Sequence, residues 1–148
     1  MELYFAYGSN MSARQIRERC PTAAYVDLGR LEGFRLTFNR KGSYRQGSVA
    51  SVELGDPHHD VVLGVLWHIS RSDLDKMDEI EDPDAYVRIA VPVANGQGDV
   101  GYAWTYVSYP DEQGLSPDAD YLKVMIQAAV EVGLPKIYVK GLERWKDA

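Results

Sequence analysis

The sequence predicts an α+β domain in which a mainly antiparallel sheet curls into a small mixed β-barrel with flanking helices. Short apolar runs recur through the first half of the chain, separated by glycine-rich turn signals, a pattern typical of antiparallel sheets and barrels. Two alternating runs between residues 86 and 107 indicate a hairpin. Three further stretches begin with helix-capping residues, which places helices around the sheet.

Composition limits the kind of protein and partner. The 148 residues suffice for a single domain, residues 1–148, with a real core. A net charge of −6 with dispersed Lys and Arg argues against nucleic acid as a partner. No apolar run approaches the roughly 18 residues of a membrane span, and a strand follows Met1 directly, so we expect neither a membrane segment nor a signal peptide. The single cysteine, Cys20, has no disulfide partner, which is typical of the cytoplasm.

The first strand, turn and helix form one unit. Residues 3–7 are aromatic and apolar enough for a short buried strand, and Gly8 then allows a backbone path that a residue with a Cβ resists. Ser12 and Gln15 have the spacing of a capping box, so the next helix is expected to start there and to end near Cys20. A strand, a glycine turn and a helix start together aim several backbone N–H groups at one anionic point.

Four further strands are predicted before the middle of the chain. They cover residues 23–27, 34–38, 49–54 and 61–69, and the turns that separate them contain Gly29, Gly33, residues 42–47 and residues 55–57. The turn signals recur at regular spacing, which favours antiparallel pairing.

An acidic helix is predicted over residues 72–82, after capping residues at 70–72. At 100° per residue and with Leu74 at zero, Met77 falls at about 300° and Glu81 at about 340°. Glu81 therefore lies inside the apolar arc and is the one carboxylate singled out for burial. Asp75 and Glu79 face water, and Asp78 lies at the edge of the arc.

The last part of the chain reads as a hairpin, a loop and a helix. Residues 86–93 alternate, a turn is expected around residues 95–96, and the returning strand covers residues 100–107. Residues 108–116 are predicted as a loop. Ser116 and Pro117 then mark a helix start as N-cap and first-turn proline. An apolar stripe runs to residue 132, Gly133 ends that helix, and residues 134–148 form a short helix and a tail.

A glutamate on an apolar arc near a loop rich in backbone donors suggests acid–base chemistry on a carbonyl group. Desolvation raises the pKa of a carboxyl group toward the range that a general base needs. The alternative is that Glu81 is an edge residue that reaches water.

Several motifs occur in the order of one known family. Residues 3–11, centred on Tyr7-Gly8-Ser9-Asn10, closely resemble the N-terminal signature of the gamma-glutamylcyclotransferases, in the AIG2-like superfamily. Residues 77–81 resemble the family's Leu-Asp-Glu-x-Glu run, whose last glutamate is catalytic and corresponds to Glu81. Other positions that match in the same order are residues 63–67, Tyr86-Val87, Tyr106, Ser116-Pro117 with Tyr121, and residues 133–135.

The resemblance implies an enzyme, an amine-releasing lyase that cyclises γ-glutamyl amino acids or amines to 5-oxoproline. The substrate's own α-amine attacks the γ-carbonyl carbon, so neither a metal nor another cofactor is needed. Glu81 takes a proton from the α-ammonium group and returns one to the departing nitrogen. The backbone amides of residues 8–10 hold either the substrate α-carboxylate or the developing oxyanion.

The resemblance also implies a set of binding residues and a kind of partner. The partner is a small γ-glutamyl molecule, and the protein is a monomer or a homodimer. For each tyrosine, core packing with an exposed hydroxyl is an equal alternative to a binding role. The substrate-binding residues are expected to be Tyr7, Gly8, Ser9, Asn10, Tyr86, Tyr106 and Tyr121.

Three other functions are considered. Ser9 is a candidate nucleophile of a serine hydrolase with a histidine as base, although Tyr-Gly-Ser-Asn differs from Gly-x-Ser-x-Gly. A second alternative is a non-catalytic small-molecule binding or regulatory domain on the same scaffold. The third is a metal site in a strand-connecting loop, where adjacent histidines are more often solvated turn residues. Its four potential ligands are Asp56, His58, His59 and Asp60.

Overall fold

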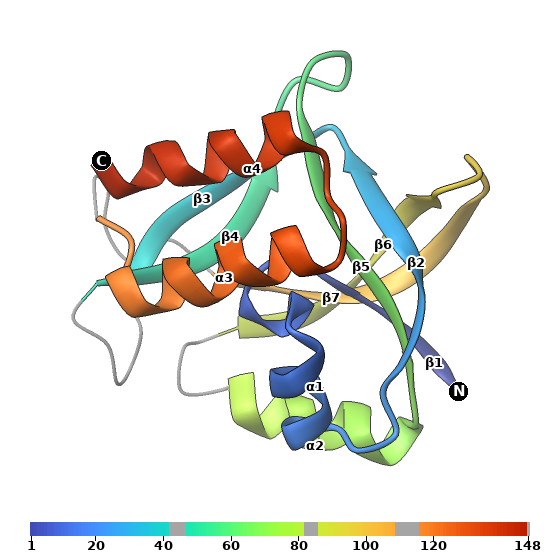
Figure 1. Ribbon diagram of the computed structural model, residues 1–148. Helices are drawn as coiled ribbons and strands as arrows, with labels where there is room; N and C mark the ends of the chain where they lie inside the picture. Colours follow the sequence, from blue (N-terminus) through green and yellow to red (C-terminus); the bar gives the residue numbers. More distant parts are fainter. Residues whose placement is uncertain (42–46, 82–85, 109–115, 148) are drawn as a thin grey trace.

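The computed structural model describes residues 1–41, 47–81, 86–108 and 116–147. Figure 1 shows their arrangement. The strands are β1 (Glu2–Ala6), β2 (Ala24–Glu32), β3 (Phe34–Lys41), β4 (Ser48–Leu54), β5 (Val61–Ile69), β6 (Tyr86–Asn95) and β7 (Val100–Ser108). The helices are α1 (Ala13–Arg19), α2 (Arg71–Glu81), α3 (Ala119–Glu131) and α4 (Lys136–Glu143), with short 3-10 helices η1 (Ser9–Met11) and η3 (Arg144–Asp147).

Five strands close into a barrel in the order β1-β5-β2-β6-β7, and β3 and β4 form a separate two-stranded sheet. Neighbouring barrel strands are antiparallel, except where β1 runs parallel to β7 and closes the barrel. The prediction of an α+β fold with a mainly antiparallel, mixed barrel and flanking helices is therefore confirmed.

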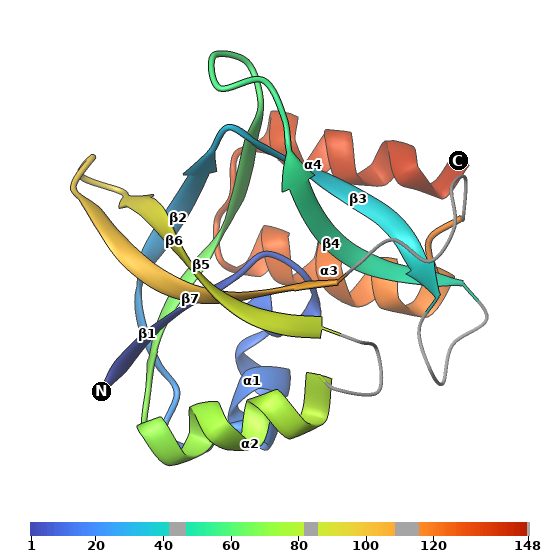
Figure 2. The ribbon, with the colours of Figure 1, turned by 180° about the vertical axis from the view of Figure 1, so that it is seen from behind.

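The helices lie in two pairs. Figures 1 and 2 both show α1 beside α2 at one end of the barrel, and α3 beside α4 next to the β3–β4 sheet. One hydrophobic core cluster includes residues from the barrel, the small sheet and all four helices. Helix α3 also contacts η1, so α3 lies against the turn that follows β1.

Two glycines inside the barrel make room for one aromatic ring. Gly29 of β2 pairs with Gly64 of β5, and a Cβ on either residue would come within 2.9 Å of the ring of Phe5. The expectation that Gly29 separates two strands is wrong, because β2 continues through it to Glu32. The turn lies at Gly33, whose φ of 80° favours glycine. Gly29 is needed for close packing inside a strand. A sequence pattern does not distinguish a glycine in this role from a glycine in a turn.

Replacing Gly64 by Ala is expected to lower the free energy of unfolding by about 3 kcal/mol, because overpacking of a filled core forces the backbone to shift. The new Cβ would overlap the backbone oxygen of Ala6, and β5 is paired on both edges. Urea denaturation followed by circular dichroism measures the loss. Gly141→Ala is the matched control, because no atom other than its chain neighbours and the backbone of its own helix lies within 4 Å of the Cβ. It should be neutral or stabilising in α4, and equal stability of the two variants would contradict the close packing.

The start of α3 differs from the sequence prediction. Its N-cap is Asp118, whose carboxylate accepts the backbone N–H of Tyr121, and the helix begins at Ala119. Ser116 instead accepts the backbone N–H of Ser48 through its own carbonyl. Ser116 and Pro117 were expected to cap the helix, but this segment pairs with the start of β4. The predicted end at Gly133 is confirmed by its φ of 85°.

Two predicted connections fall mostly outside the described residues. They are the turn at residues 42–47, of which only Gly47 is described, and most of the loop at residues 108–116. The predicted hairpin formed by β6 and β7 is confirmed along its whole length. None of the helices in the described part of the chain has the length and apolar character that crossing a bilayer requires.

Candidate active site

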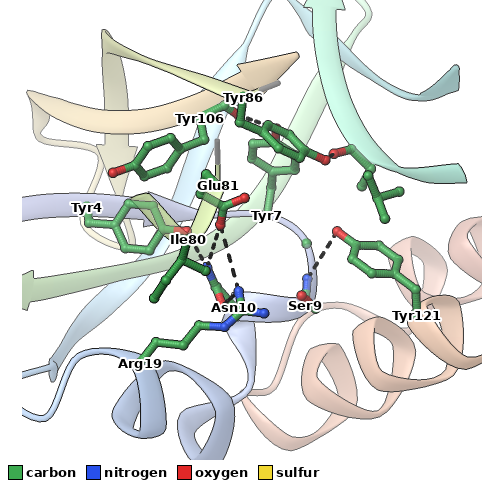
Figure 3. Close-up of a pocket in the computed structure, with 13 residues that line it drawn as sticks. Tyr4, Tyr7, Ser9, Asn10, Arg19, Ile80, Glu81, Tyr86, Tyr106 and Tyr121 are labelled. Atoms are coloured by element: carbon green, nitrogen blue, oxygen red, sulfur yellow. Dashed lines mark hydrogen bonds and ion pairs between the residues drawn. The ribbon is translucent and has the colours of Figure 1, made fainter. Parts of the chain in front are cut away.

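A pocket opens between the end of β1, the C-terminal end of α2 and the N-terminal part of α3 (Figure 3). All eight residues that the sequence singled out contribute to its lining. Segments more than seventy positions apart in sequence thus meet at one place. The lining residues are Tyr4, Tyr7, Gly8, Ser9, Asn10, Arg19, Val49, Ala50, Ile80, Glu81, Tyr86, Tyr106 and Tyr121.

The pocket has a buried end and an accessible rim. The residues of β1, η1, β4, β7 and α3 that line it are all buried. The lining residues that retain exposure are Arg19, Ile80, Glu81 and Tyr86, and the Ile80 side chain is 38% exposed. A ligand therefore enters past the end of α2 and reaches η1 and its surrounding tyrosines at the inner end.

Glu81 is the last residue of α2, and its side chain is 13% exposed. Its Oε1 atom accepts a hydrogen bond from Asn10 Nδ2 at 3.4 Å and lies 3.8 Å from Arg19 Nη1. Figure 3 shows both contacts converging on the carboxylate. The predicted position of Glu81, near the loop that follows the first strand, agrees with this geometry.

Hydrogen bonds to its oxygen fix the orientation of the Asn10 side-chain amide. Its Oδ1 atom accepts hydrogen bonds from Gln15 Nε2 at 2.9 Å and from Arg19 Nη1 at 3.0 Å. Because both neighbours are donors, the amide NH₂ must point toward Glu81 and the hydroxyl of Tyr4, to which it donates at 3.0 Å. The sequence predicted a role for the backbone N–H of Asn10. In the structure, its side-chain amide also donates a hydrogen bond to Glu81.

Gln15 does not complete the predicted capping box. Ser12 caps α1 as expected, by accepting the backbone N–H of Gln15. The Gln15 side chain, however, donates to Ser9 Oγ at 2.6 Å as well as to Asn10. The N–H of Ser12, which it was expected to satisfy, already donates to the carbonyl of Ser9. Gln15 therefore organises η1.

The helical wheel singled out Glu81 for burial, but Asp73 is the carboxylate of α2 that is buried, and the Glu81 side chain keeps 13% of its surface exposed. Asp73 is 3% exposed and accepts both the backbone N–H and the hydroxyl of Thr22, at 2.9 and 2.6 Å. These hydrogen bonds, the hydroxyl first, lower the pKa of Asp73. Asp73 lies at the end of α2 far from Glu81, where it ties α2 to the segment before β2. Its role is structural.

Gly8 is required for space. Its φ of −110° is not left-handed, so the predicted resistance to a Cβ does not come from the sign of φ. A Cβ at this position would instead overlap the hydroxyl of Tyr121. That hydroxyl accepts the backbone N–H of Ser9 at 3.4 Å. In the described part of the chain, the N–H groups of Gly8 and Asn10 have no acceptor.

Three tyrosine hydroxyls at the pocket donate to protein atoms. Tyr7 donates to the carbonyl of Tyr106, and Tyr86 donates to the carbonyl of Ala50. Tyr106 donates to Asp78 Oδ1 at 2.6 Å, and Figure 3 shows its hydroxyl turned away from Glu81. These three residues line the pocket with their rings, and their hydroxyls hold its walls together.

Burial keeps the tyrosines protonated. It is the main cause that raises the pKa of Tyr7 and of Tyr121. The pKa of Tyr4 is raised by burial and then by the nearby charge of Glu81. For Tyr106, burial and the hydrogen bond to Asp78 both raise the pKa. These four tyrosines are therefore neutral phenols at physiological pH, and the lining also includes one carboxylic side chain, Glu81, and one guanidinium side chain, Arg19.

A second cluster fixes α2 against the hairpin. Asp78 accepts from Tyr106 and lies 3.3 Å from Arg88 Nε. The guanidinium of Arg88 stacks over Trp104 at 4.6 Å from the ring centroid. Asp78 is one turn before Glu81, so this cluster holds the end of α2 that carries Glu81 in place.

Five lining residues were missed by sequence reasoning, and two of them, Tyr4 and Arg19, contact the side chain of Asn10. Tyr4 lies inside a strand that was predicted as buried, where aromatic residues are usually core. Arg19 follows Gln15 at i+4 on α1, and both donate to Asn10. Two long polar donors at helical spacing directly after the Tyr7-Gly8-Ser9-Asn10 turn are the signal that points to it.

The arrangement of the described residues favours neither a serine hydrolase at Ser9 nor a metal site in the turn after β4. The Ser9 hydroxyl is engaged by Gln15, and none of the described lining residues is a histidine. In the turn after β4, the carboxylates of Asp56 and Asp60 accept backbone N–H groups. No group of three or more His, Cys, Asp or Glu suited to a metal ion occurs among the described residues.

Comparisons with known proteins agree on one family. The model of the AIG2-like family matches residues 61–142. The chain is 35% identical over 147 residues to a gamma-glutamylcyclotransferase of Homo sapiens, with 95% of this chain and 77% of the relative covered. A Bos taurus gamma-glutamylcyclotransferase is 34% identical, with 95% and 76% covered. A solved structure of a gamma-glutamyl cyclotransferase superposes with a TM-score of 0.87 at 33% identity, covering 96% of this chain and 86% of that one.

Proposed function

Because the chain belongs to the gamma-glutamylcyclotransferase family, we propose that it cyclises γ-glutamyl amino acids or amines to 5-oxoproline with Glu81 as the catalytic acid and base. In this reaction the α-amine nitrogen of the substrate bonds to its γ-carbonyl carbon, and the amide C–N bond breaks. The departing nitrogen leaves as a free amine or amino acid. The single observation that supports the assignment most is the convergence of Asn10 and Arg19 on Glu81 at the pocket.

Glu81 handles both proton transfers. It removes a proton from the substrate's α-ammonium group, which frees the nitrogen lone pair for attack, and it then protonates the departing nitrogen. Asn10 and Arg19 donate toward Oε1, so the carboxylate is held in one orientation. The rest of the acceleration comes from holding the substrate folded, because ring closure is intramolecular.

The backbone of η1 forms the binding end of the pocket. The N–H groups of Gly8 and Asn10 have no acceptor among the described residues and lie at a buried position. They suit the α-carboxylate of the γ-glutamyl group, which brings two acceptor oxygens into a site where an unpaired donor is costly. The rings of Tyr7, Tyr86, Tyr106 and Tyr121 form the surrounding wall.

The test is to incubate the purified protein with a panel of γ-glutamyl amino acids and amines and to measure 5-oxoproline by mass spectrometry. We expect stoichiometric release of 5-oxoproline and the free amine from at least one member of the panel, without added metal. Binding of the panel in calorimetry with no turnover would instead identify a non-catalytic binding domain on the same scaffold. A covalent adduct with a serine-reactive phosphonate at Ser9, together with loss of activity, would favour the hydrolase.

We also infer that residues 1–148 form a single cytoplasmic domain. One core cluster joins strands and helices from both ends of the chain, and the single cysteine is buried and unpaired, as is common in a reducing compartment. The pocket is built within one chain, so either a monomer or a homodimer is compatible with the chemistry.

A further inference from the structure

A second hollow, which we call the α3–η3 groove, lies where the C-terminal segment of the chain meets the start of α3. Figures 1 and 2 both show these two segments beside each other. The described lining residues come from residues 116–123 and from Trp145 and Lys146 of η3. The volume of the groove is about 340 Å³, which lies within the range of about 300 to 1,000 Å³ that small-molecule sites occupy.

The α3–η3 groove is separate from the active-site pocket. The two hollows share no lining residue in the described part of the chain. Tyr121 lines the active site, whereas Ala119, Leu122 and Lys123 line the groove. At 100° per residue these three residues lie about 100° to 200° around the helix from Tyr121. A ligand in the groove therefore does not need an empty active site.

The floor of the groove is apolar and held in place. Leu122 is 2% exposed, and the side chain of Trp145 is half-buried. Trp145 packs against Phe38 with the ring centroids 4.8 Å apart, and Phe38 packs edge-on against Tyr121 at 6.5 Å. Because aromatic contacts of this kind restrict the orientation of a ring, the exposed part of Trp145 offers a fixed surface to an apolar ligand.

Two cations and no described carboxylate line the groove. Lys123 belongs to α3 and Lys146 to η3, and both are exposed. Neither lysine has an ion-pair partner among the described residues. In a chain with a net charge of −6, two cations over an apolar floor favour an anion with an apolar body. A carboxylate has two acceptor oxygens, one for each ammonium group.

We propose that the α3–η3 groove is a second binding site, which takes a small aromatic carboxylate. The ring of the ligand lies on Trp145 and Leu122, and its carboxylate pairs with Lys123 and Lys146. This site lies beyond the proposed function and does not depend on it, because none of its described lining residues belongs to the active-site pocket.

The test is a titration of the isotopically labelled protein with 2-naphthoate and with its neutral counterpart 2-naphthamide, followed by NMR. The indole N–H signal of Trp145, identified by its absence in Trp145→Phe, reports binding in the groove. We expect 2-naphthoate to shift this signal saturably, with a Kd of about 1 mM or lower. The amide should bind about 4- to 25-fold more weakly, because two exposed ion pairs are lost.

Single substitutions of the two lysines locate the charge that the ligand contacts. Lys123→Met and Lys146→Met should each weaken the binding of 2-naphthoate by about two- to fivefold, and the binding of 2-naphthamide should not change. Lys140→Met is the matched control, because Lys140 is an exposed lysine of α4 that does not line the groove. Its affinity for both compounds should equal that of the wild type.

The proposal is overturned if the Trp145 signal does not shift, or if the acid and the amide bind equally. It is also overturned if 2-naphthoate shifts only the backbone N–H signals of residues 8–10, since the ligand would then occupy the active-site pocket. A Trp145 signal that moves with protein concentration in the absence of ligand would assign the groove to a second copy of the chain instead. The comparison of the two compounds on the wild-type protein decides even where a variant does not fold.

Discussion

Replacing Glu81 by Gln is expected to lower kcat by at least about 10³-fold, because general acid–base catalysis by one positioned group contributes this much. The amide keeps the size of the carboxylate, and its Oε1 can still accept from Asn10 and face Arg19, so the pocket should keep its shape. The variant has no group that removes a proton from the α-ammonium. Release of 5-oxoproline under saturating substrate measures the loss.

Binding should survive in this variant. A substrate analogue in which a methylene group replaces the scissile nitrogen should bind to Glu81→Gln within about threefold of its wild-type affinity in calorimetry, since the η1 backbone and the tyrosine walls are unchanged. Glu79→Gln is the matched control, because Glu79 is exposed on the same helix and the substitution removes the same charge. Its activity should stay within about twofold of wild type. Full activity in Glu81→Gln would refute the assignment.

The sequence predicted the parts of the site that depend on local structure. Helical periodicity placed Glu81 on the inward face of α2, which is a regular helix that ends at that residue, but it missed the burial of Asp73 on the same helix. The N-terminal turn was placed by a strand pattern followed by a capped helix. The barrel class followed from regular turn spacing, which the observed strands largely reproduce.

The contacts that the sequence did not predict are tertiary. Nothing in the local pattern distinguishes Gly29, which makes room for Phe5, from a turn glycine. Asp73 could be recognised as structural only from its partner Thr22, which lies 51 positions earlier. Arg19 likewise takes its meaning from Asn10 and Glu81, which the fold brings to it. Charged side chains depend most on such partners, because the energetic cost of their burial is set by what they contact.

The dependence of Glu81 on Asn10 predicts a large effect of Asn10→Asp. The substitution keeps the shape of the side chain but replaces the NH₂ that donates to Glu81 at 3.4 Å with an oxygen. Two carboxylates at this distance do not readily ionise together, so one retains a proton to a higher pH. We expect kcat/KM near pH 7 to fall by about 100-fold. The acid limb of its pH profile should move upward, with partial recovery of activity at alkaline pH.

Two further variants separate this electrostatic effect from loss of structure. Asn10→Ala removes the hydrogen bond without adding charge, so its activity should fall while its acid limb does not move upward. Asn95→Asp adds the same charge in the distant β6–β7 turn, where the side-chain oxygen accepts two backbone N–H groups and an aspartate can do the same. Its profile should match wild type. If Asn10→Asp loses activity equally at every pH, Asn10 supports only the shape of η1, and the ionised state of Glu81 does not depend on it.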